Sequence, residues 1–177
     1  MRLRALFAAT IVCLVMVWAE ASSLWLDVPF VKQQGRGCGA AAISMVLQYW
    51  SRNDVNVEPS ASDPEKIMQL LFSQKAGGVF ASDMQKYFED QGFRVFVFHG
   101  VRSDVENHLQ KGRPLIVCLN ENTLHYVVVA GIDSDRNILF INDPAEKKLM
   151  QIEWAEFEKR WGVMHNWTLL AVPGKLK

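Results

Sequence analysis

A single cysteine between two glycines opens the stretch of sequence that most constrains the fold. Cys38 lies between Gly37 and Gly39, and three alanines lead from there into the apolar segment Ile43–Trp50, whose large side chains recur at helical spacing. This pattern predicts a buried helix that carries the thiol in its first turn. Backbone N–H groups at a helix start lack partners and the helix dipole is positive there, which favours a thiolate over a thiol. Cys38 is therefore a candidate nucleophile. The alternative is a small buried hydrophobic residue, the usual role of a free cysteine.

The composition indicates one domain with a substantial core. The chain has 177 residues, of which 50% are hydrophobic, and this size suits one globular unit better than two. The 19 basic and 19 acidic residues balance each other, so the sequence carries no electrostatic footprint for nucleic acid. We therefore expect a single domain, most simply a monomer, with no nucleic-acid partner.

The first 21 residues form a separate segment. Residues 1–4 are basic, residues 5–18 are almost entirely apolar, and residues 19–21 have the small-x-small form of a signal peptidase site. The segment 1–21 is therefore predicted to be a secretory signal peptide, with the mature domain over 22–177. The apolar run is short for a spanning helix, which needs about 20 residues. The predicted location is secreted or periplasmic, with an uncleaved N-terminal membrane anchor as the alternative.

Two cysteines remain once the signal peptide is removed. Cys38 and Cys118 would form a disulfide in many exported proteins. Cys118, however, lies within the continuous apolar run 114–119, which is typical of a central buried strand. We therefore expect Cys118 to contribute packing and Cys38 to stay free.

Helices come first along the chain and strands second. Asp63 and Pro64 supply a cap and a first-turn proline for one helix, and Trp154, Phe157 and Trp161 recur at helical spacing late in the chain. Helices are expected at about 39–50, 64–72, 82–91 and 103–112, and strands at about 93–98, 114–119, 126–132, 137–142 and 167–172. The predicted fold class is α+β, with the N-terminal helices packed on a mostly antiparallel sheet.

One histidine is placed to serve as a base for the cysteine. His125 immediately precedes the strand 126–132, Asp143 immediately follows the strand 137–142, and residue 134 is the midpoint of the two. In an antiparallel hairpin this symmetry puts His125 and Asp143 next to each other. The carboxylate would then accept the Nδ1–H bond and direct Nε2 toward a thiol. The other three histidines have no such partner.

An oxyanion formed during attack on a carbonyl needs hydrogen-bond donors. The backbone N–H of Cys38 can supply one, and a glutamine amide is the usual second. Gln33 and Gln34 both lie a few residues upstream, and we favour Gln33. No C-x-x-C or H-E-x-x-H spacing is found, so neither a metal nor another cofactor is expected.

These motifs together resemble a known family. A glutamine and a short loop precede Cys38, the helix that follows ends in Tyr49-Trp50, and two further motifs are Leu124–Val129 and Asn142–Pro144. The chain resembles the bacteriocin-processing cysteine peptidases, the double-glycine leader peptidases with a papain-like fold. The resemblance implies Cys38 as nucleophile, His125 as base, Asp143 as its orienting group and a glutamine in the oxyanion hole. It also implies cleavage after small residues in a leader peptide.

The chain is expected to be a stand-alone, exported member of this family, because it has no Walker-type glycine loop. The leading hypothesis is a thiol peptidase that cleaves a peptide or protein through an acyl-enzyme. One alternative uses the same three residues in a non-proteolytic amidase or transpeptidase. Another is a domain that binds a peptide without cutting it. A membrane is expected to matter only through the signal segment, if that segment is not cleaved.

Overall fold

The computed structural model describes residues 23–53, 55–121 and 123–174, so the predicted signal peptide lies outside the described residues. The helices are α1 (Cys38–Arg52), the short 3-10 helix η1 (Pro59–Ser62), α2 (Pro64–Leu71), α3 (Ala81–Asp90), α4 (Arg102–Gln110) and α5 (Trp154–Val163). The strands are β1 (Ser23–Trp25), β2 (Phe72–Ser73), β3 (Gly78–Val79), β4 (Phe93–His99), β5 (Leu115–Asn120), β6 (Leu124–Asp133), β7 (Ile138–Asn142), β8 (Met150–Glu153) and β9 (Trp167–Pro173). The fold class is α+β, as predicted. Within the described ranges no helix combines the length and apolar character that a membrane crossing requires.

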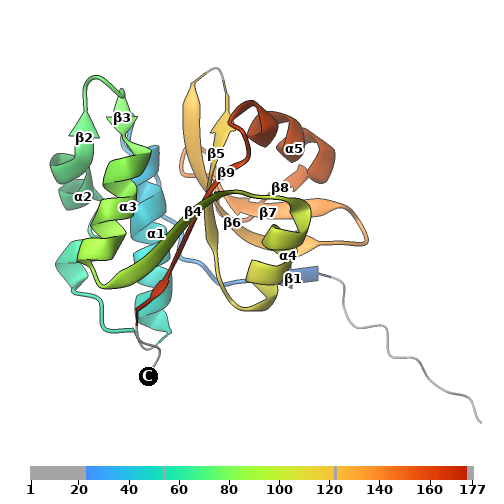
Figure 1. The fold of residues 1–177 in the computed structure, drawn as a ribbon, viewed down its shortest axis with the longest axis horizontal. Coiled ribbons are helices and arrows are strands. Elements are labelled where there is room, and N and C mark those ends of the chain that lie inside the picture. Colours follow the sequence, from blue (N-terminus) through green and yellow to red (C-terminus); the bar gives the residue numbers. More distant parts are fainter. Residues whose placement is uncertain (1–22, 54, 122, 175–177) are drawn as a thin grey trace, which may run out of the picture.

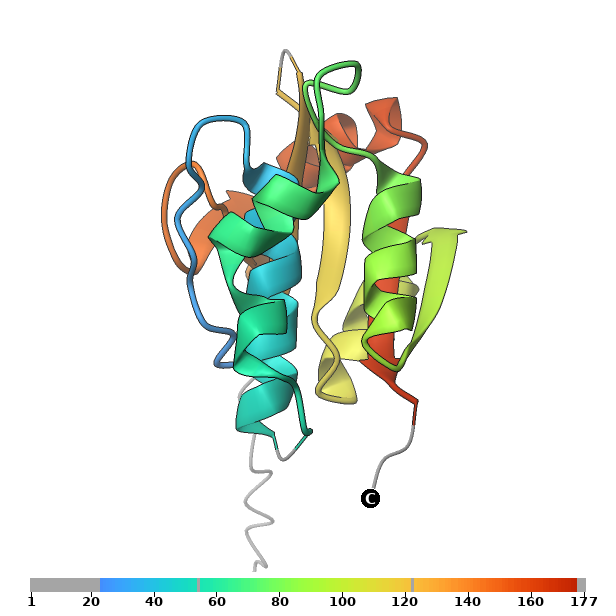
Figure 2. The ribbon, with the colours of Figure 1, turned by 90° about the vertical axis from the view of Figure 1, so that its left-hand side faces the viewer.

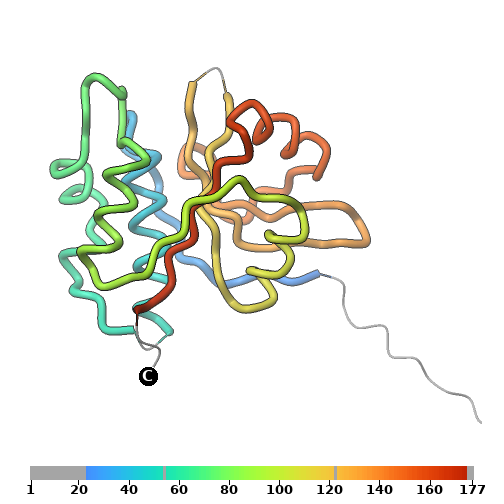
Figure 3. Tube along the Cα trace, viewed as in Figure 1, coloured from blue at the N-terminus to red at the C-terminus, as the bar shows by residue number. Residues whose placement is uncertain are grey.

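The main sheet is antiparallel throughout its described pairs. Its strand order is β4-β9-β5-β6-β7-β8, and β1 pairs with the far end of β6. The last strand, β9, lies between β4 and β5 and separates two strands that precede it in the chain (Figure 1). The Cα trace shows β4 and β9 running next to each other (Figure 3). The end of the chain thus joins the edge strand β4 to the rest of the sheet.

The helices cover the two sides of this sheet. Figure 1 shows α1, α2 and α3 on one side and α4 and α5 on the other. Seen from the helical side, α2 lies against α1, and α3 lies beside β4 (Figure 2). The first helix is therefore enclosed between the sheet and its neighbouring helices, which explains why so few of its side chains reach solvent.

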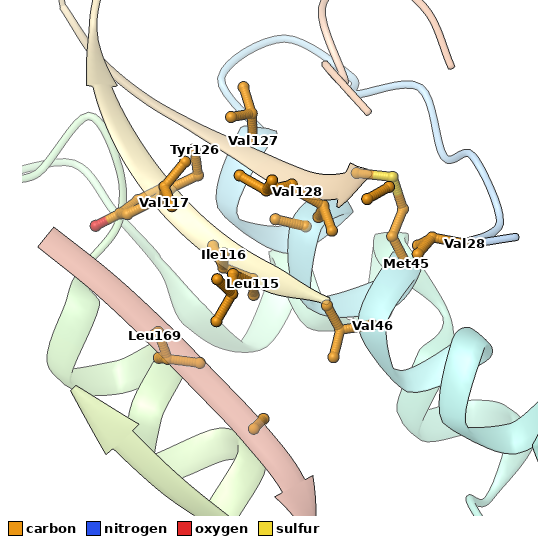
Figure 4. Close-up of a cluster of buried hydrophobic side chains, with 14 of the residues drawn as sticks. Val28, Met45, Val46, Leu115, Ile116, Val117, Tyr126, Val127, Val128 and Leu169 are labelled. Atoms are coloured by element: carbon orange, nitrogen blue, oxygen red, sulfur yellow. The ribbon is translucent and has the colours of Figure 1, made fainter. Parts of the chain in front are cut away.

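The core lies where α1 meets the central strands. Met45 and Val46 from α1 pack with Val117 of β5, Val128 of β6 and Leu169 of β9 (Figure 4). Each of these side chains is at most 1% exposed. The three small alanines at the start of α1 are also buried. Small side chains there let the first turn of the helix approach the sheet closely, which brings Cys38 near β6.

Local sequence signals predicted most helix ends. Asp63 caps α2 by accepting hydrogen bonds from the backbone N–H groups of Glu65 and Lys66. Gly92 ends the segment after α3 with φ of +82°, a conformation that favours glycine. The apolar face of the late helix is confirmed, because Trp154, Phe157 and Trp161 are the buried residues of α5.

Several elements differ from the prediction. Phe72 was expected to extend the second helix, but α2 ends at Leu71 and Phe72 begins the small hairpin β2–β3, where it is half-exposed. The sequence signal for this hairpin is weak because each strand has only two residues. The strand β8 was also missed, since four residues give too short a pattern to recognise alternation.

Trp161 provides a test of the core. Its side chain is 1% exposed and its Nε1–H donates to the backbone oxygen of Trp167. We expect Trp161→Ala to lower the free energy of unfolding by about 3–5 kcal/mol, because it removes a large buried ring and leaves a cavity. Val163→Ala, at a position 56% exposed on the same helix, should change it by less than about 0.5 kcal/mol. Urea unfolding of both variants measures the difference, and similar losses would contradict this account of α5.

Candidate active site

Cys38 is the first residue of α1, and the glycines on both sides are required by close contacts. A Cβ atom at Gly37 would lie 2.9 Å from the backbone oxygen of Gln34, and one at Gly39 would lie 2.8 Å from Cβ of Val79. Both distances are shorter than side chains tolerate. The Gly-Cys-Gly pattern therefore reflects packing of the helix start against the preceding loop and the β2–β3 hairpin.

His125 and Asp143 are joined by a buried hydrogen bond. The Nε2–H of His125 donates to Oδ1 of Asp143 at 2.8 Å, and the two residues are 7% and 1% exposed. The Cys38 thiol lies close enough to the same imidazole for His125 to lower its pKa. Because Nε2 is engaged by the carboxylate, Nδ1 is the nitrogen left for the thiol. The predicted use of the two ring nitrogens is wrong: Asp143 contacts Nε2 instead of Nδ1.

The predicted register of the hairpin is also wrong, although the predicted contact between His125 and Asp143 is present. β6 and β7 pair through Val128 with Asn142, and a bulge lies between Val129 and Gly131. Continuing this pairing would set Asp143 opposite Val127, two residues from His125. The two side chains therefore meet diagonally across the ladder, a contact that long side chains can make.

The surroundings keep Asp143 ionised. Burial alone would raise the pKa of this carboxyl group, but the hydrogen bond from His125 and the backbone N–H groups of Ala145 and Glu146 lower it. The Ala145 N–H donates to Oδ1 at 2.8 Å. A carboxylate held by backbone donors cannot swing away from the imidazole, so its position is fixed by the turn that follows β7.

The cysteine and histidine favour the charged pair. Burial would raise the pKa of the Cys38 thiol, but the hydrogen bond from His125 and the backbone N–H groups of Tyr126 and Gly39 bring it below its ordinary value. Burial would likewise lower the pKa of His125, whereas hydrogen bonds with Asp143 and Cys38 raise it to about 10. The lowered Cys38 pKa and the raised His125 pKa both favour a thiolate paired with an imidazolium.

Neither upstream glutamine has its amide nitrogen free. Gln33 Nε2 donates to the backbone oxygen of Gly35 at 2.8 Å, and Gln34 Nε2 donates to Oε1 of Glu65 at 3.0 Å. The side-chain oxygen of Gln33 is buried without a hydrogen-bond partner among the described atoms. Both glutamines line a cavity of about 260 Å³ between the loop before Cys38 and α2. The choice of Gln33 as the oxyanion donor stays a prediction.

Asn142 supports the site, although its role was not foreseen. It is fully buried, and its Nδ2 donates to the backbone oxygens of Val28 and Pro29 at 3.1 and 3.3 Å. Its Oδ1 accepts from the Leu149 N–H at 2.9 Å. The segment before the cysteine is thereby tied to the turn that holds Asp143. The only sequence signal for this role of Asn142 is that it directly precedes Asp143, a predicted site residue.

Cys118 takes no part in a disulfide. Cys38 and Cys118 are both free, and Cys118 is 3% exposed on the central strand β5, as expected. Burial and the nearby Cys38 raise the pKa of the Cys118 thiol to about 11.

The other three histidines lie elsewhere in the fold. His99 Nδ1 is hydrogen-bonded to the backbone oxygen of His165, and the His108 ring lies 6.0 Å from Phe98. These three histidines have structural surroundings of their own.

One group of donors among the described residues has the spacing of metal ligands. Glu121, His125 and Asp143 each offer an atom, and these atoms lie within 4.8 Å of one another. The atoms that could bind a metal already form hydrogen bonds. His125 Nε2 is bonded to Asp143, and the Arg160 guanidinium donates to Oε1 of Glu121 at 2.8 Å. The positive charge of Arg160 beside this group disfavours a cation.

Comparison with known proteins identifies the family. A family model described as the Peptidase_C39 like family matches residues 25–168. The chain belongs to this family. It is therefore a cysteine peptidase by family, a class of hydrolase, and the predicted family resemblance is confirmed. No curated protein matches the chain at a significant level.

Solved structures of C39 peptidase domains share the fold. The peptidase domain of Streptococcus ComA, a bi-functional ABC transporter involved in a quorum sensing pathway, is 21% identical with a TM-score of 0.65, covering 82% of this chain and 98% of that one. A double glycine motif protease from an AMS/PCAT transporter, crystallised in complex with the leader peptide, is 24% identical with a TM-score of 0.63, covering 84% and 94%. The papain-like α+β architecture of this C39-like peptidase is thereby confirmed.

Labelling by iodoacetamide tests the state of the thiol. We expect Cys38 to react rapidly below the ordinary thiol pKa of ~8.5. His125→Ala should move the reaction to higher pH, because it removes the imidazole that lowers the Cys38 pKa while the burial that raises it remains. Intact mass measured over time at each pH gives the rate.

Cys118→Ala is the matched control for this labelling. Its thiol is buried with a raised pKa, so this variant should react like the unmodified protein. Labelling of Cys38 only at alkaline pH, or unchanged labelling in His125→Ala, would contradict the proposed ion pair.

Proposed function

We propose that this C39-like peptidase hydrolyses peptide bonds with Cys38 as nucleophile, His125 as general base and acid, and Asp143 as the group that orients His125. The observation that carries the proposal is the buried 2.8 Å hydrogen bond between His125 and Asp143, with the Cys38 thiol close enough to the same imidazole for His125 to lower its pKa. A packed core has no need for a thiol, an imidazole and a carboxylate grouped in this way. Nucleophilic catalysis needs all three.

The reaction follows from these contacts. The Cys38 thiolate attacks the carbonyl carbon of the scissile amide, and the imidazolium of His125 gives its Nδ1 proton to the leaving amine. The acyl-enzyme is then hydrolysed by a water whose proton His125 accepts. The oxyanion is stabilised by the backbone N–H of Cys38 at the helix start and by the side-chain amide of Gln33. For the amide of Gln33 to donate, its nitrogen must leave the backbone oxygen of Gly35.

The substrate is proposed to be a peptide with small residues before the scissile bond, such as a leader peptide. Next to the nucleophile, Val79 of the hairpin β2–β3 lies so close that a Cβ on Gly39 would contact it at 2.8 Å, and the ring of Tyr126 lies on the same side at 3.4 Å. Both residues are less than 10% exposed, and the Tyr126 ring packs edge-on against Trp167. Rigid neighbours of this kind leave little room for a large side chain.

The protein is further proposed to act as a monomer outside the cytoplasm. The basic opening and the apolar run within residues 1–21 support export, and they precede the first described strand. Expression in a secreting host followed by intact mass measurement tests this, and a mature form that begins at Ser22 is the expected result.

A peptide cleavage assay tests the proposed chemistry. A fluorogenic peptide with Gly-Gly before the scissile bond should be cleaved by the unmodified chain. Cys38→Ala should reduce kcat by at least about 1000-fold, because it removes the thiolate that attacks the carbonyl. Asp143→Ala should reduce kcat more than it raises KM, because it acts through His125. Cleavage that survives in Cys38→Ala would show that this thiol is not the nucleophile, and transfer of the acyl group to an added amine in place of water would favour a transpeptidase.

Val79 is expected to limit the size of the residue at the cleavage site. Val79→Ala removes two methyl groups beside Gly39, so kcat/KM for a peptide with Ala before the scissile bond should rise relative to Gly by about tenfold. Val97→Ala, at a position 43% exposed on β4, makes the same chemical change elsewhere and should leave the ratio unaltered. An unchanged ratio in Val79→Ala would contradict the steric basis of the specificity.

A further inference from the structure

A second carboxylate faces the histidine. Oε2 of Glu121 lies 3.9 Å from Nε2 of His125, the nitrogen that also donates to Asp143 at 2.8 Å. The other oxygen of Glu121, Oε1, accepts a hydrogen bond from Nη1 of Arg160 at 2.8 Å. Arg160 is itself held by Glu156, whose Oε1 accepts from Nε at 2.8 Å. Arg160, itself held by Glu156, therefore fixes the orientation of the Glu121 carboxylate on the side away from His125.

The parts of this arrangement come from two elements that the core holds in place. Glu121 directly follows β5, and its backbone N–H bonds to the backbone oxygen of Thr123, within the short connection to His125 on β6. Arg160 projects from α5, which is held in place by its buried aromatic residues Trp154, Phe157 and Trp161. Because this packing anchors α5, the position of Arg160 relative to the connection between β5 and β6 is fixed.

We propose that Glu121 is a positioning residue for His125. This role rests on the proposed function, in which His125 is the base. With one oxygen bound to Arg160, the carboxylate stays too far away to take Nε2–H from Asp143, yet it remains the next acceptor in reach. It restricts rotation of the imidazole to orientations in which Nδ1 faces the thiol, and it accepts Nε2–H when Asp143 is lost.

The charges around the imidazole are consistent with this role. The groups facing His125 are Cys38 from the start of α1, Asp143 after β7 and Glu121 after β5. Arg160 and Glu156 stand behind Glu121 and lie 36% and 45% exposed at their side chains. Two carboxylates on the Nε2 side favour the imidazolium that forms during the reaction. Arg160 offsets part of this charge, so that the imidazolium can still release its proton.

A double-mutant cycle in the full chain tests the proposal. The variants are Glu121→Gln, Asp143→Ala and both together, with kcat and KM measured for the Gly-Gly peptide. Glu121→Gln alone should lower kcat about threefold with little change in KM. In the Asp143→Ala background the same substitution should lower kcat by a further tenfold or so, because Glu121 is then the remaining acceptor for Nε2–H. Equal effects in the two backgrounds would overturn the proposal.

Titration of His125 by 15N NMR gives a readout that does not require activity. Loss of a negative neighbour should lower the His125 pKa by about half a unit in Glu121→Gln, and Glu121→Asp should restore part of the shift. Glu153→Gln is the matched control, because Glu153 lines the same cleft of about 810 Å³ beside Asp143 but is not among the groups that face His125. A His125 titration that is the same in Glu121→Gln and Glu153→Gln would overturn the proposal.

The two measurements separate this inference from the proposed function. If the unmodified chain cleaves no peptide, the proposed function fails, while the NMR titration still reports on Glu121. Arg160→Met repeats the test from the other partner, because it releases the Glu121 carboxylate without altering it. Arg160→Met should shift the titration of His125 in the 15N NMR spectrum, and Arg160→Lys should reverse part of that shift. Thermal unfolding of each variant distinguishes a local effect from loss of the fold.

Discussion

The buried hydrogen bond between His125 and Asp143 is the interaction on which the site depends. An imidazole that is 7% exposed would ordinarily be neutral, because burial disfavours its charged form. The carboxylate reverses this balance, and the resulting imidazolium in turn stabilises a thiolate at Cys38. The three groups therefore set one another's charge, so that the loss of one partner changes the protonation of the other two. Burial would raise the pKa of Asp143, but His125 lowers it, and backbone N–H groups after β7 lower it further, so the carboxylate and the imidazole each stabilise the charge of the other.

The start of α1 imposes a second constraint, which is steric. Cys38 must combine the unpaired N–H groups of a helix terminus with close contact to β6, and only small residues permit this approach. Gly37 and Gly39 leave no space for a Cβ, and the alanines that follow let the helix sit against the sheet. The same close packing brings Val79 and Tyr126 beside the nucleophile. The geometry that activates the thiol thus also limits what can reach it, which connects reactivity and specificity through one set of contacts.

The sequence predicted the parts of this site that depend on local patterns. Helical spacing identified α1 and Cys38, and the symmetry of a hairpin brought His125 and Asp143 together. That symmetry argument was wrong in register because the turn centres between Asp135 and Arg136 and not at residue 134. The bulge between Val129 and Gly131 offsets only one residue of this difference, and neither feature leaves a reliable mark in the sequence. The choice of ring nitrogen depends on side-chain orientation, which the alternation of a strand does not specify. Glu121 and Arg160 are 39 residues apart and meet only because α5 packs against β5, so no local pattern reveals their contact.

The position of β9 explains why the site is a property of the whole domain. This last strand separates β4 from β5, and the Nε1–H of Trp50 at the far end of α1 donates to the backbone oxygen of Ala171 on it. Trp167 on the same strand packs against Tyr126, the neighbour of His125. Without β9, the strand β4 has no partner in the sheet, Trp50 of α1 loses a hydrogen-bond acceptor and Tyr126 loses an aromatic neighbour. Pairing between such distant segments carries an entropic cost of loop closure, which the burial of the strand must offset. The nucleophile lies early in the sequence, yet its environment is completed only by the final strand of the chain.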